Sequence, residues 1–452
     1  MGCGFLKTLR TLKKHSAESV DFADEISDQS KYLHVHRSIE DDLIALLRSA
    51  KQSSNKSLVL LCGSAGDGKS HMLSYLKNSE HADLLEGFNI RNDATESDAP
   101  HRTAPETLSK ALQAYDDNHI GDGGLEKTVV AINLGLLARF LESPSGENFK
   151  ELRQYVDEVG LLKTGLSNVS EIENLYFYAV DFSDYQIFLI RDGEIEADFT
   201  STLLERVFSP TEDNPFYAAR CKACRACGID TTLCPVKQNY DFLQNKYVRD
   251  NIAEMLVEIA LREKCVITAR AVLDFIYEAL VSPDFDIEKL VNKNAASPRE
   301  FAPAYLAMTT PQLLFSSKDS NGLISKFTQL DPMNDSSGWT DEVATAFRTS
   351  EENIKSVLKG VKGTPYEETF SSCPGFSPKN ISQSESARTD IKEAVLSFVI
   401  RCAYLINSCD EIRLGFERKN YIPEFVQLLY YYNIGEEKEL RYLKKTVTEQ
   451  GN

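Results

Sequence analysis

The hydrophobic positions in the first third of the chain alternate between one-sided, helix-like spacing and short continuous runs. Residues 38–50 have apolar side chains at 39, 43, 46, 47 and 50, which is the spacing of an amphipathic helix, with Ser38 placed as its N-cap. The run "SLVLLC" at 57–62 is apolar throughout, as in a central strand that is covered on both faces. The pattern therefore predicts a helix that leads into a buried strand.

Further apolar runs follow this strand at 88–90, 128–134 and 175–182, and a helical pattern at 104–115 lies between two of them. Strands that alternate with helices are typical of a mostly parallel sheet with helices on both faces. At 188–197, Asp-Gly stands between two extended runs, which predicts a hairpin within or after that sheet. The expected fold class is therefore α/β, with a three-layer core.

Beyond the first half of the chain the patterns become helical, at 251–263, at 268–280 and again near the end. Two stretches, 316–345 and 361–390, are rich in Ser, Asp, Asn, Gly and Pro, which predicts loops or linkers. The longest apolar run, 394–407, has Arg401 in its middle and is shorter than the roughly 18 residues that cross a bilayer, so it predicts a buried helix. No secretory signal is visible, and we expect a cytoplasmic protein.

The glycine-rich segment "GSAGDGKS" joins the first predicted strand to a helical pattern and matches G-x-x-x-x-G-K-S. Glycines let backbone N–H groups approach phosphate oxygens, the lysine reaches the β and γ phosphates, and the hydroxyl that follows it binds Mg²⁺. Lys69 is thereby also a candidate catalytic residue, and Ser70 is the expected magnesium ligand. The motif predicts a P-loop that binds ATP or GTP with Gly63, Ser64, Ala65, Gly66, Asp67, Gly68, Lys69, Ser70 and His71.

Hydrolysis also needs a carboxylate at a strand end that holds Mg²⁺ through water, and usually an acid that orients the attacking water. Asp181 ends the fourth predicted strand and matches the first role best, with Asp184 close behind it. Asp93 and Glu96 follow the second strand and are candidates for the second role, although each could equally be a capping or solvated acid. The third strand ends in Asn133, where an acid would be expected, so a switch that hydrolyses slowly stays open.

Arg270 opens a helical pattern after the predicted core. Related ATPases place an arginine there that senses the γ-phosphate. An arginine in the first turn of a helix is more commonly an ordinary surface residue, so both interpretations stay open.

Four of the ten cysteines stand close together, in "CKACRACGIDTTLC" with the spacing C-x2-C-x2-C-x6-C. Four thiolates suit Zn²⁺ or an iron–sulfur cluster, and zinc is favoured over an iron–sulfur cluster or free thiols. The spacing differs from the two separated C-x2-C pairs of common structural zinc sites, and Pro235 after the run is similar to a ferredoxin pattern. We expect a structural metal module built from Cys221, Cys224, Cys227 and Cys234.

The composition limits the function classes. Apolar residues make up 42% and charged residues 26% of the 452 residues, which is ordinary for a globular protein. The formal net charge of −18 argues against a protein that holds nucleic acid through a general positive field. All seven histidines lie within the first 119 residues, which disfavours a histidine-dependent hydrolase or metal site in the later chain.

Five segments of the chain are considered together: "YLHVHRSIEDDL", "LVLLCGSAGDGKSHMLSYLK", "NDATES", "AINLGLL" and "DFSDYQIF". Together they resemble the DptF family of DNA phosphorothioation-dependent restriction proteins, most clearly within residues 1–190. That family belongs to a bacterial defence system that attacks DNA lacking phosphorothioate marks. The resemblance implies an ATPase component that acts with DptG and DptH partners on unmodified DNA, and it supplies no nuclease.

Three functions are therefore in competition. The leading hypothesis is an ATP-hydrolysing subunit of a DNA-restriction assembly, and the second is a nucleotide-dependent assembly switch without motor activity. The third is direct nucleic-acid binding, for which Arg220, Lys222 and Arg225 supply too few phosphate contacts. "LLYYYN" at 428–433 could stack bases, although a buried core helix is the commoner interpretation.

A chain of this length exceeds what one hydrophobic core serves, so we expect several parts. The core should carry the nucleotide and the later parts should serve as lid and docking surfaces. The predicted division is an N-terminal helical segment (1–56), a P-loop NTPase core (57–205), a cysteine-rich metal module (206–245), a helical lid-like region (246–315), an irregular linker (316–390) and a C-terminal helical region (391–452).

Overall fold

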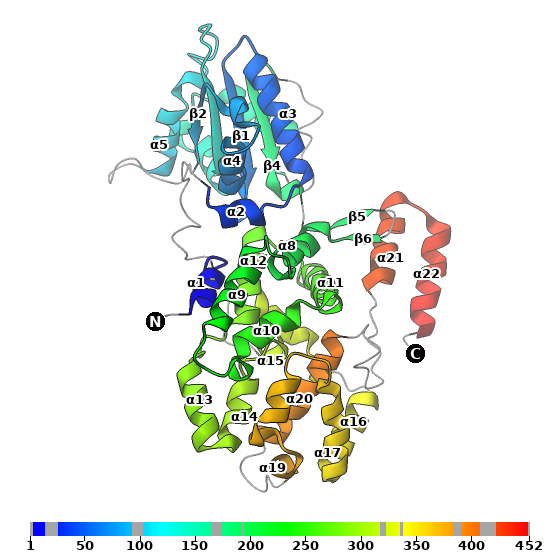
Figure 1. The fold of residues 1–452 in the computed structure, drawn as a ribbon. Helices are drawn as coiled ribbons and strands as arrows, with labels where there is room; N and C mark the ends of the chain where they lie inside the picture. The colour runs from blue at the N-terminus through cyan, green and yellow to red at the C-terminus, as the bar shows by residue number, and fades with distance from the viewer. Residues whose placement is uncertain are drawn as a thin grey trace. The chain divides into compact units, whose positions relative to one another are not determined.

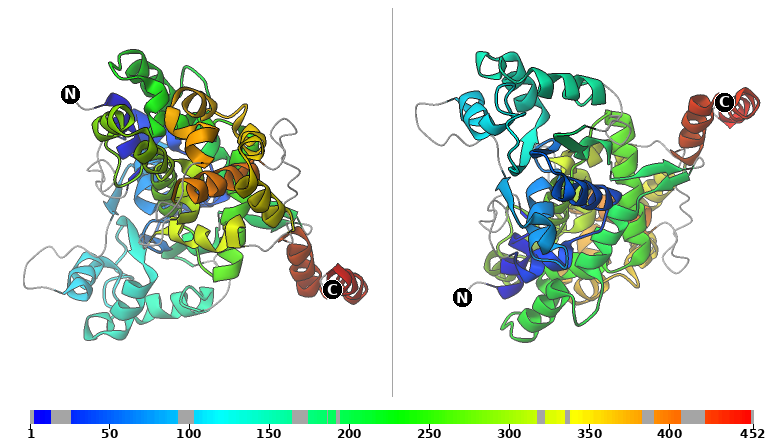
Figure 2. Two further views of the ribbon diagram at one scale, coloured as in Figure 1. Left: turned by 90° about the horizontal axis from the view of Figure 1, so that it is seen from below. Right: turned by 90° about the horizontal axis from the view of Figure 1, so that it is seen from above.

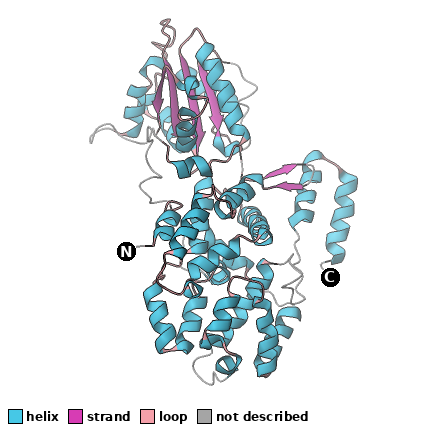
Figure 3. Ribbon diagram, viewed as in Figure 1, coloured by secondary structure: helices cyan, strands magenta, loops and turns pink. Residues whose placement is uncertain are grey.

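The computed structural model shows an α/β protein with one four-stranded parallel sheet and many helices (Figures 1 and 3). The chain separates into two compact units. Val20–Ile187 and Thr268–Arg270 form the first, which we call the sheet unit, and Met1–Ser19, Phe188–Ile267 and Ala271–Asn452 form the helical unit. The structure describes residues 3–13, 26–92, 103–163, 174–185, 187–191, 194–316, 322–334, 338–382, 390–406 and 422–450.

The sheet has the order β2-β3-β1-β4, and every neighbouring pair is parallel. Each strand lies on one of the predicted apolar runs, so the prediction of a mostly parallel sheet is confirmed. The central strand is buried along its whole length, which explains why its sequence has no polar face. The strands are β1 (Ser57–Gly63), β2 (Phe88–Arg91), β3 (Lys127–Asn133) and β4 (Phe177–Asp181).

Helices cover both faces of this sheet. On one face, Val59 and Leu61 of β1 pack with side chains of α3 (Ser38–Gln52), α4 (Lys69–Lys77) and the 3-10 helix η2 (Ala82–Leu85). On the other face, the alternate β1 residues Leu58, Leu60 and Cys62 pack with apolar side chains of a second helical layer. The sheet unit therefore has three layers, and the second layer consists of α5 (Ala104–Ala111), α6 (Leu134–Glu142) and α7 (Lys150–Val159).

The start of α3 differs by one residue from the prediction. Ser38 is the first helical residue, and the N-cap is Arg37, whose backbone is extended. Arg37 makes no side-chain cap of its own helix, while its carbonyl accepts the N–H of Glu40. The Arg37 side chain is thereby left to make contacts elsewhere. The remaining elements of the sheet unit are α2 (Asp28–Leu33), η3 (Gln113–Tyr115), η4 (Pro144–Gly146) and η5 (Phe182–Asp184).

The helical unit contains the predicted hairpin and the predicted helices. The hairpin forms a separate antiparallel pair, β5 (Leu189–Arg191) with β6 (Glu194–Glu196). The first part of the unit consists of α1 (Gly4–Arg10), α8 (Asp198–Phe208), α9 (Pro215–Arg225), η6 (Thr231–Leu233), α10 (Pro235–Leu243), α11 (Lys246–Glu263), α12 (Ala269–Leu280), α13 (Ile287–Ala296), α14 (Pro298–Leu306) and α15 (Thr310–Ser316).

The prediction of irregular structure at 316–345 and 361–390 is wrong for the part of these stretches that the structure describes. Short helices occupy it, because the polar residues start helices instead of forming loops: Asp331 accepts the N–H of Met333, and Ser377 accepts that of Asn380. The elements from here to α20 are η7 (Leu323–Leu330), η8 (Pro332–Asn334), α16 (Gly338–Thr349), α17 (Glu351–Leu358), η9 (Lys359–Val361), α18 (Glu367–Ser372), η10 (Pro374–Phe376) and α19 (Pro378–Ser382).

The last two helices, α21 (Ile422–Ile434) and α22 (Glu437–Gln450), lie side by side (Figure 2). Residues 428–433 are helical as expected, but they do not belong to a buried core. Tyr432 is 70% exposed, and Phe425 on the same helix is 46% exposed. The apolar sequence of α21 is therefore only partly covered, by α22 and β6. In the described part of the chain, no helix is both long enough and apolar enough to cross a bilayer.

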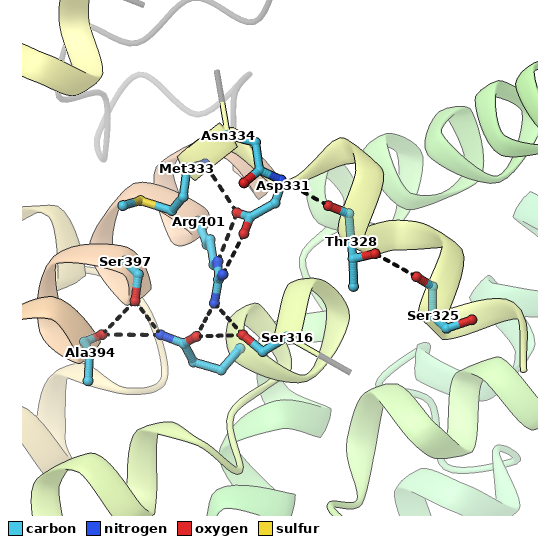
Figure 4. Close-up of polar contacts among 10 residues, drawn as sticks. Ser316, Ser325, Thr328, Asp331, Met333, Asn334, Ala394, Ser397 and Arg401 are labelled. Carbon is cyan, nitrogen blue, oxygen red and sulfur yellow. Dashed lines mark hydrogen bonds and ion pairs between the residues drawn. The ribbon is translucent and has the colours of Figure 1, made fainter. Parts of the chain in front are cut away.

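A buried ion pair joins three segments of the helical unit (Figure 4). Arg401 lies on α20 (Asp390–Leu405), and its Nε donates to Asp331 Oδ1 at 3.0 Å while its Nη2 donates to Oδ2 at 2.6 Å. Its Nη1 donates to Ser316 at 2.8 Å and also to Gln312, which in turn donates to Ser397 at 2.9 Å. Both charged side chains are less than a tenth exposed, so the prediction of a buried helix around Arg401 is confirmed.

Replacement of Arg401 by Met should lower the free energy of unfolding of the helical unit by about 3–5 kcal/mol, because Asp331 would stay buried without its partner. Urea denaturation followed by circular dichroism measures this loss. Arg348→Met is the matched control, since Arg348 pairs with Glu393 of the same helix α20 in an exposed position, where an ion pair is worth up to about 1 kcal/mol. Equal losses in the two variants would contradict the prediction.

Candidate nucleotide site

The predicted P-loop connects the central strand β1 to helix α4, as its sequence context indicated. Gly63, Gly66 and Gly68 all have positive φ angles, of 148°, 91° and 99°. Side chains rarely adopt this backbone, and a Cβ on Gly63 would also lie 2.8 Å from the carboxylate of Asp67 and from the Cβ of Phe182. The glycines of the motif are therefore required by the shape of the loop itself.

The loop lies between two polar strand ends. Gly63 is opposite Asn133 of β3, and Cys62 is opposite Asp181 of β4, because both strands run parallel to β1. Asp181 is 5% exposed, and its Oδ1 accepts the N–H of Ser183 at 2.9 Å. Asn133 caps α6, since its Oδ1 accepts the N–H of Gly135 at 2.8 Å. The structure thus places Asp181 on one side of the loop and Asn133 on the other.

The charged groups of the loop are bonded within the loop. Nζ of Lys69 donates to the carbonyl oxygens of Gly63 at 3.1 Å and of Ser64 at 2.6 Å. The carboxylate of Asp67 accepts the N–H of Ser64 at 2.5 Å and is almost fully buried. Burial raises the pKa of Asp67, the hydrogen bond from Ser64 and the charge of Lys69 oppose this, and the charge of Asp181 adds to it. Ser70, by contrast, is exposed in the first turn of α4.

Arg37 also reaches the loop, and sequence reasoning assigned it no role. Its Nη2 donates to the carbonyl oxygen of Asp67 at 3.1 Å, and its guanidinium lies 5.4 Å from the ring centroid of Phe182. Burial lowers the pKa of Arg37, and the charges of Asp67 and Glu40 oppose that shift. The only sequence signal was a basic residue directly before the helix that leads into β1.

His71 is engaged in a cluster beside α4. Its Nε2 lies 3.2 Å from Nδ1 of His34, whose Nε2 lies 3.0 Å from a carboxylate oxygen of Glu40. The ring of His34 stacks on Tyr75, with centroids 3.4 Å apart. Burial lowers the pKa of His71 to about 4, and the charges of His34 and Arg37 add to the shift. The structure gives His71 these contacts, and its predicted role in nucleotide binding stays a prediction.

Arg270 lies in the first turn of α12, within the short segment Thr268–Arg270 that belongs to the sheet unit, and it contacts the loop through its backbone. Its N–H donates to the carbonyl oxygen of Gly66 at 3.2 Å. A Cβ on Gly66 would lie 3.1 Å from the Cβ of Arg270 and from Oγ1 of Thr268. The structure therefore brings Arg270 to the P-loop, and the sensor role of its side chain stays a prediction. The other predicted residues are placed less fully: Asp184 ends η5, and Asp93 and Glu96 lie outside the described residues.

The four clustered cysteines lie on the helical unit, and all of them fall within its described part. Cys221 and Cys224 are on α9, Cys227 follows it, and Cys234 is the N-cap of α10. No three or more His, Cys, Asp or Glu side chains of the described residues are arranged to hold a metal ion. The predicted zinc site and its iron–sulfur alternative both stay predictions.

These thiols have a neighbour that the sequence spacing did not indicate. Helix α1 packs against α9, and the charge of Cys3 at the start of α1 contributes to raising the pKa of both Cys224 and Cys234. The main cause of both shifts is burial, which raises the pKa of Cys234 to about 12. Cys3 is more than 200 residues away from the cysteine cluster in the sequence, so the local spacing of cysteines could not indicate that they are neighbours.

No protein-family model matches the chain, and searches of curated proteins and of solved structures return no match. The resemblance to the DptF family is therefore carried by the sequence segments alone. The geometry around the P-loop is the independent basis for a functional argument.

Protonation of His71 should destabilise the sheet unit as the pH falls. The pKa is about 4 in the folded chain and ordinarily 6.5, so the unfolded chain binds the extra proton between these values. The stability contributed by neutral His71 is present above about pH 6.5 and is lost towards pH 4, with a slope of at most about 1.4 kcal/mol per pH unit.

Urea denaturation of the wild type and of His71→Gln between pH 4 and 7 measures this contribution as the difference between the two profiles. His36→Gln controls for the loss of an imidazole, because His36 belongs to the same unit but is 61% exposed. Parallel profiles for the wild type and His71→Gln would contradict the assignment.

Proposed function

We propose that the chain is a P-loop NTPase that binds ATP with Mg²⁺ and hydrolyses it. The observation that carries the proposal is the position of residues 63–70. They turn between a fully buried parallel strand and a helix N-terminus, with Lys69 as the first residue of α4 and Asp181 at the neighbouring strand end. Backbone N–H groups and the positive end of a helix dipole are suited to phosphate at such a position.

Three side chains have distinct roles in this proposal. Lys69 would leave the carbonyl oxygens of Gly63 and Ser64 and reach the β and γ phosphates. Ser70 would bind Mg²⁺ directly, and Asp181 would hold it through water. Mg²⁺ supplies the neutralisation of the phosphate charge that phosphoryl transfer requires. Asp93 and Glu96 are the candidates for orienting the attacking water, with Arg270 as a candidate sensor.

At the level of the assembly, we propose an ATPase subunit of a phosphorothioation-dependent restriction complex with DptG and DptH as partners. This part rests on the sequence resemblance. The net charge of −18 is consistent with it, because an acidic chain suits a subunit of a complex better than the sole DNA-binding surface. DNA would then be reached through the complex, and cleavage is assigned to another subunit.

A second candidate is a nucleotide-dependent assembly switch that hydrolyses slowly or not at all. Asn133 favours the switch, because Asn133 is the last residue of β3, the strand next to β1, at a position where hydrolysis would need an acid. Its amide oxygen is also committed to the start of α6. Both candidates bind nucleotide, and they differ in turnover.

Lys69→Ala should abolish both ATP binding and turnover, because the cation that faces the phosphates is lost. Asp181→Asn should retain nucleotide binding and lose turnover by on the order of 100-fold, since it removes the charge proposed to hold Mg²⁺. Phosphate release and calorimetric binding measure the two effects. Asp157→Asn, the same change on the exposed side of α7, should leave both unchanged.

The same assays with unmodified DNA, phosphorothioated DNA and the two expected partners test the assembly. Turnover that rises with unmodified DNA and partners supports the restriction ATPase. Full turnover in Lys69→Ala would overturn the proposed function, and tight binding without turnover in every mixture would leave the assembly switch.

A further inference from the structure

Asp67 is a variable position of the P-loop motif, and its side chain is turned into the loop. Its Oδ2 accepts the backbone N–H of Ser64 at 2.5 Å, and the residue is only 7% exposed. The same oxygen lies 2.8 Å from the position that a Cβ on Gly63 would take. The carboxylate therefore occupies the inner side of the turn, where the backbone donors of such loops otherwise meet phosphate oxygens.

Lys69 is held in the same small region. Its Nζ is bonded to the carbonyl oxygens of Gly63 and Ser64, and it lies 3.7 Å from the same Cβ position of Gly63. The Ser64 N–H and the Lys69 ammonium are two groups of the loop that recognise anions. Both are engaged by the loop itself in this structure.

The carboxylate of Asp67 is negatively charged, as are the phosphates of the nucleotide proposed to bind the loop. The charged groups around it are Lys69 in the loop, Arg37 from the segment before α3, and Asp181 at the end of β4. Arg37 bonds to the carbonyl oxygen of Asp67, so this backbone contact can stay in place while the side chain turns away. A phosphate that binds Ser64 must take the place of this carboxylate.

We propose that the Asp67 carboxylate is a competitor for the phosphate site, so that nucleotide binds only by displacing it, and that Asp67 thereby sets the nucleotide affinity and the preference for the Mg²⁺ complex. This inference rests on the proposed function and deepens it. A free nucleotide meets the displaced carboxylate and Asp181 with its full negative charge. Its Mg²⁺ complex carries less negative charge and is repelled less.

The test compares ADP and a non-hydrolysable ATP analogue on the full-length wild type and Asp67→Asn, by calorimetry with Mg²⁺ and with EDTA. The Asn side chain keeps an acceptor for Ser64 and removes the charge. We expect about tenfold tighter binding in the variant, which is close to the repulsion between two unit charges about 4 Å apart in water. The gain should be larger in EDTA than in Mg²⁺.

Asp67→Ser is the second variant, which keeps a small polar side chain, and it should show the same gain if it folds with the wild-type circular dichroism spectrum. Asp157→Asn on α7 changes the net charge equally and should leave the affinity unchanged. Equal or weaker binding in both folded Asp67 variants would overturn the inference. An equal gain in Asp157→Asn would also overturn it, because the effect would then be one of net charge.

The dependence on pH gives an independent readout. The ratio of the two affinities, wild type over Asp67→Asn, cancels the titration of the nucleotide and of Lys69, Arg37 and Asp181. It should approach one as the pH falls through the pKa of Asp67, which burial raises, and a ratio that is constant from pH 8 down to the lowest pH at which both proteins stay folded would overturn the inference. Lys69→Ala distinguishes failure of the proposed function from failure of this inference. If Lys69→Ala binds nucleotide normally, the proposed function fails. If Asp67→Asn binds nucleotide with unchanged affinity, only the competitor role of Asp67 fails.

Discussion

The parallel pairing of β1 on both of its edges is the constraint on which the site depends. Because β3 and β4 run in the same direction as β1, their carboxyl ends meet at one edge of the sheet, and the chain leaves β1 between Asn133 and Asp181. Helical layers on both faces exclude water from the strand, so that Cys62 is fully buried immediately before the loop begins. The glycines of the loop then permit a turn that brings its N–H groups and Lys69 together.

Polar contacts inside the loop stabilise this turn. Buried donors and charged groups are costly without partners, and here Asp67 and Lys69 are bonded to the backbone of the same loop. Arg37 and Arg270 contact the loop from segments on either side of it in the sequence. The Ser64 N–H and the Lys69 ammonium could exchange these internal partners for an anion. This exchange is the physical basis of the proposed nucleotide binding and of the proposed competition by Asp67.

The helical unit uses charge differently. Arg401 and Asp331 are buried with all three guanidinium nitrogens engaged, so the ion pair defines how α15, α20 and the segment after η7 pack. The clustered cysteines are instead divided between a helix, its exposed end and the N-cap of the next helix. The residues of the proposed activity therefore belong to the sheet unit, whereas Arg401, Asp331 and the clustered cysteines belong to the helical unit.

Local pattern determined the elements of this protein: the apolar runs predicted the four strands, and the glycines and Lys69 predicted the loop, because both depend on neighbours in sequence. It failed at 316–345 and 361–390, where capping residues were interpreted as loop residues. Only the tertiary structure placed Arg37 on the loop, Arg401 against Asp331 and Cys3 near the other thiols. Such contacts join segments that are distant in the sequence. They depend on how buried surfaces pack and on which buried charges must then be paired, and the local spacing of residues contains no information about either.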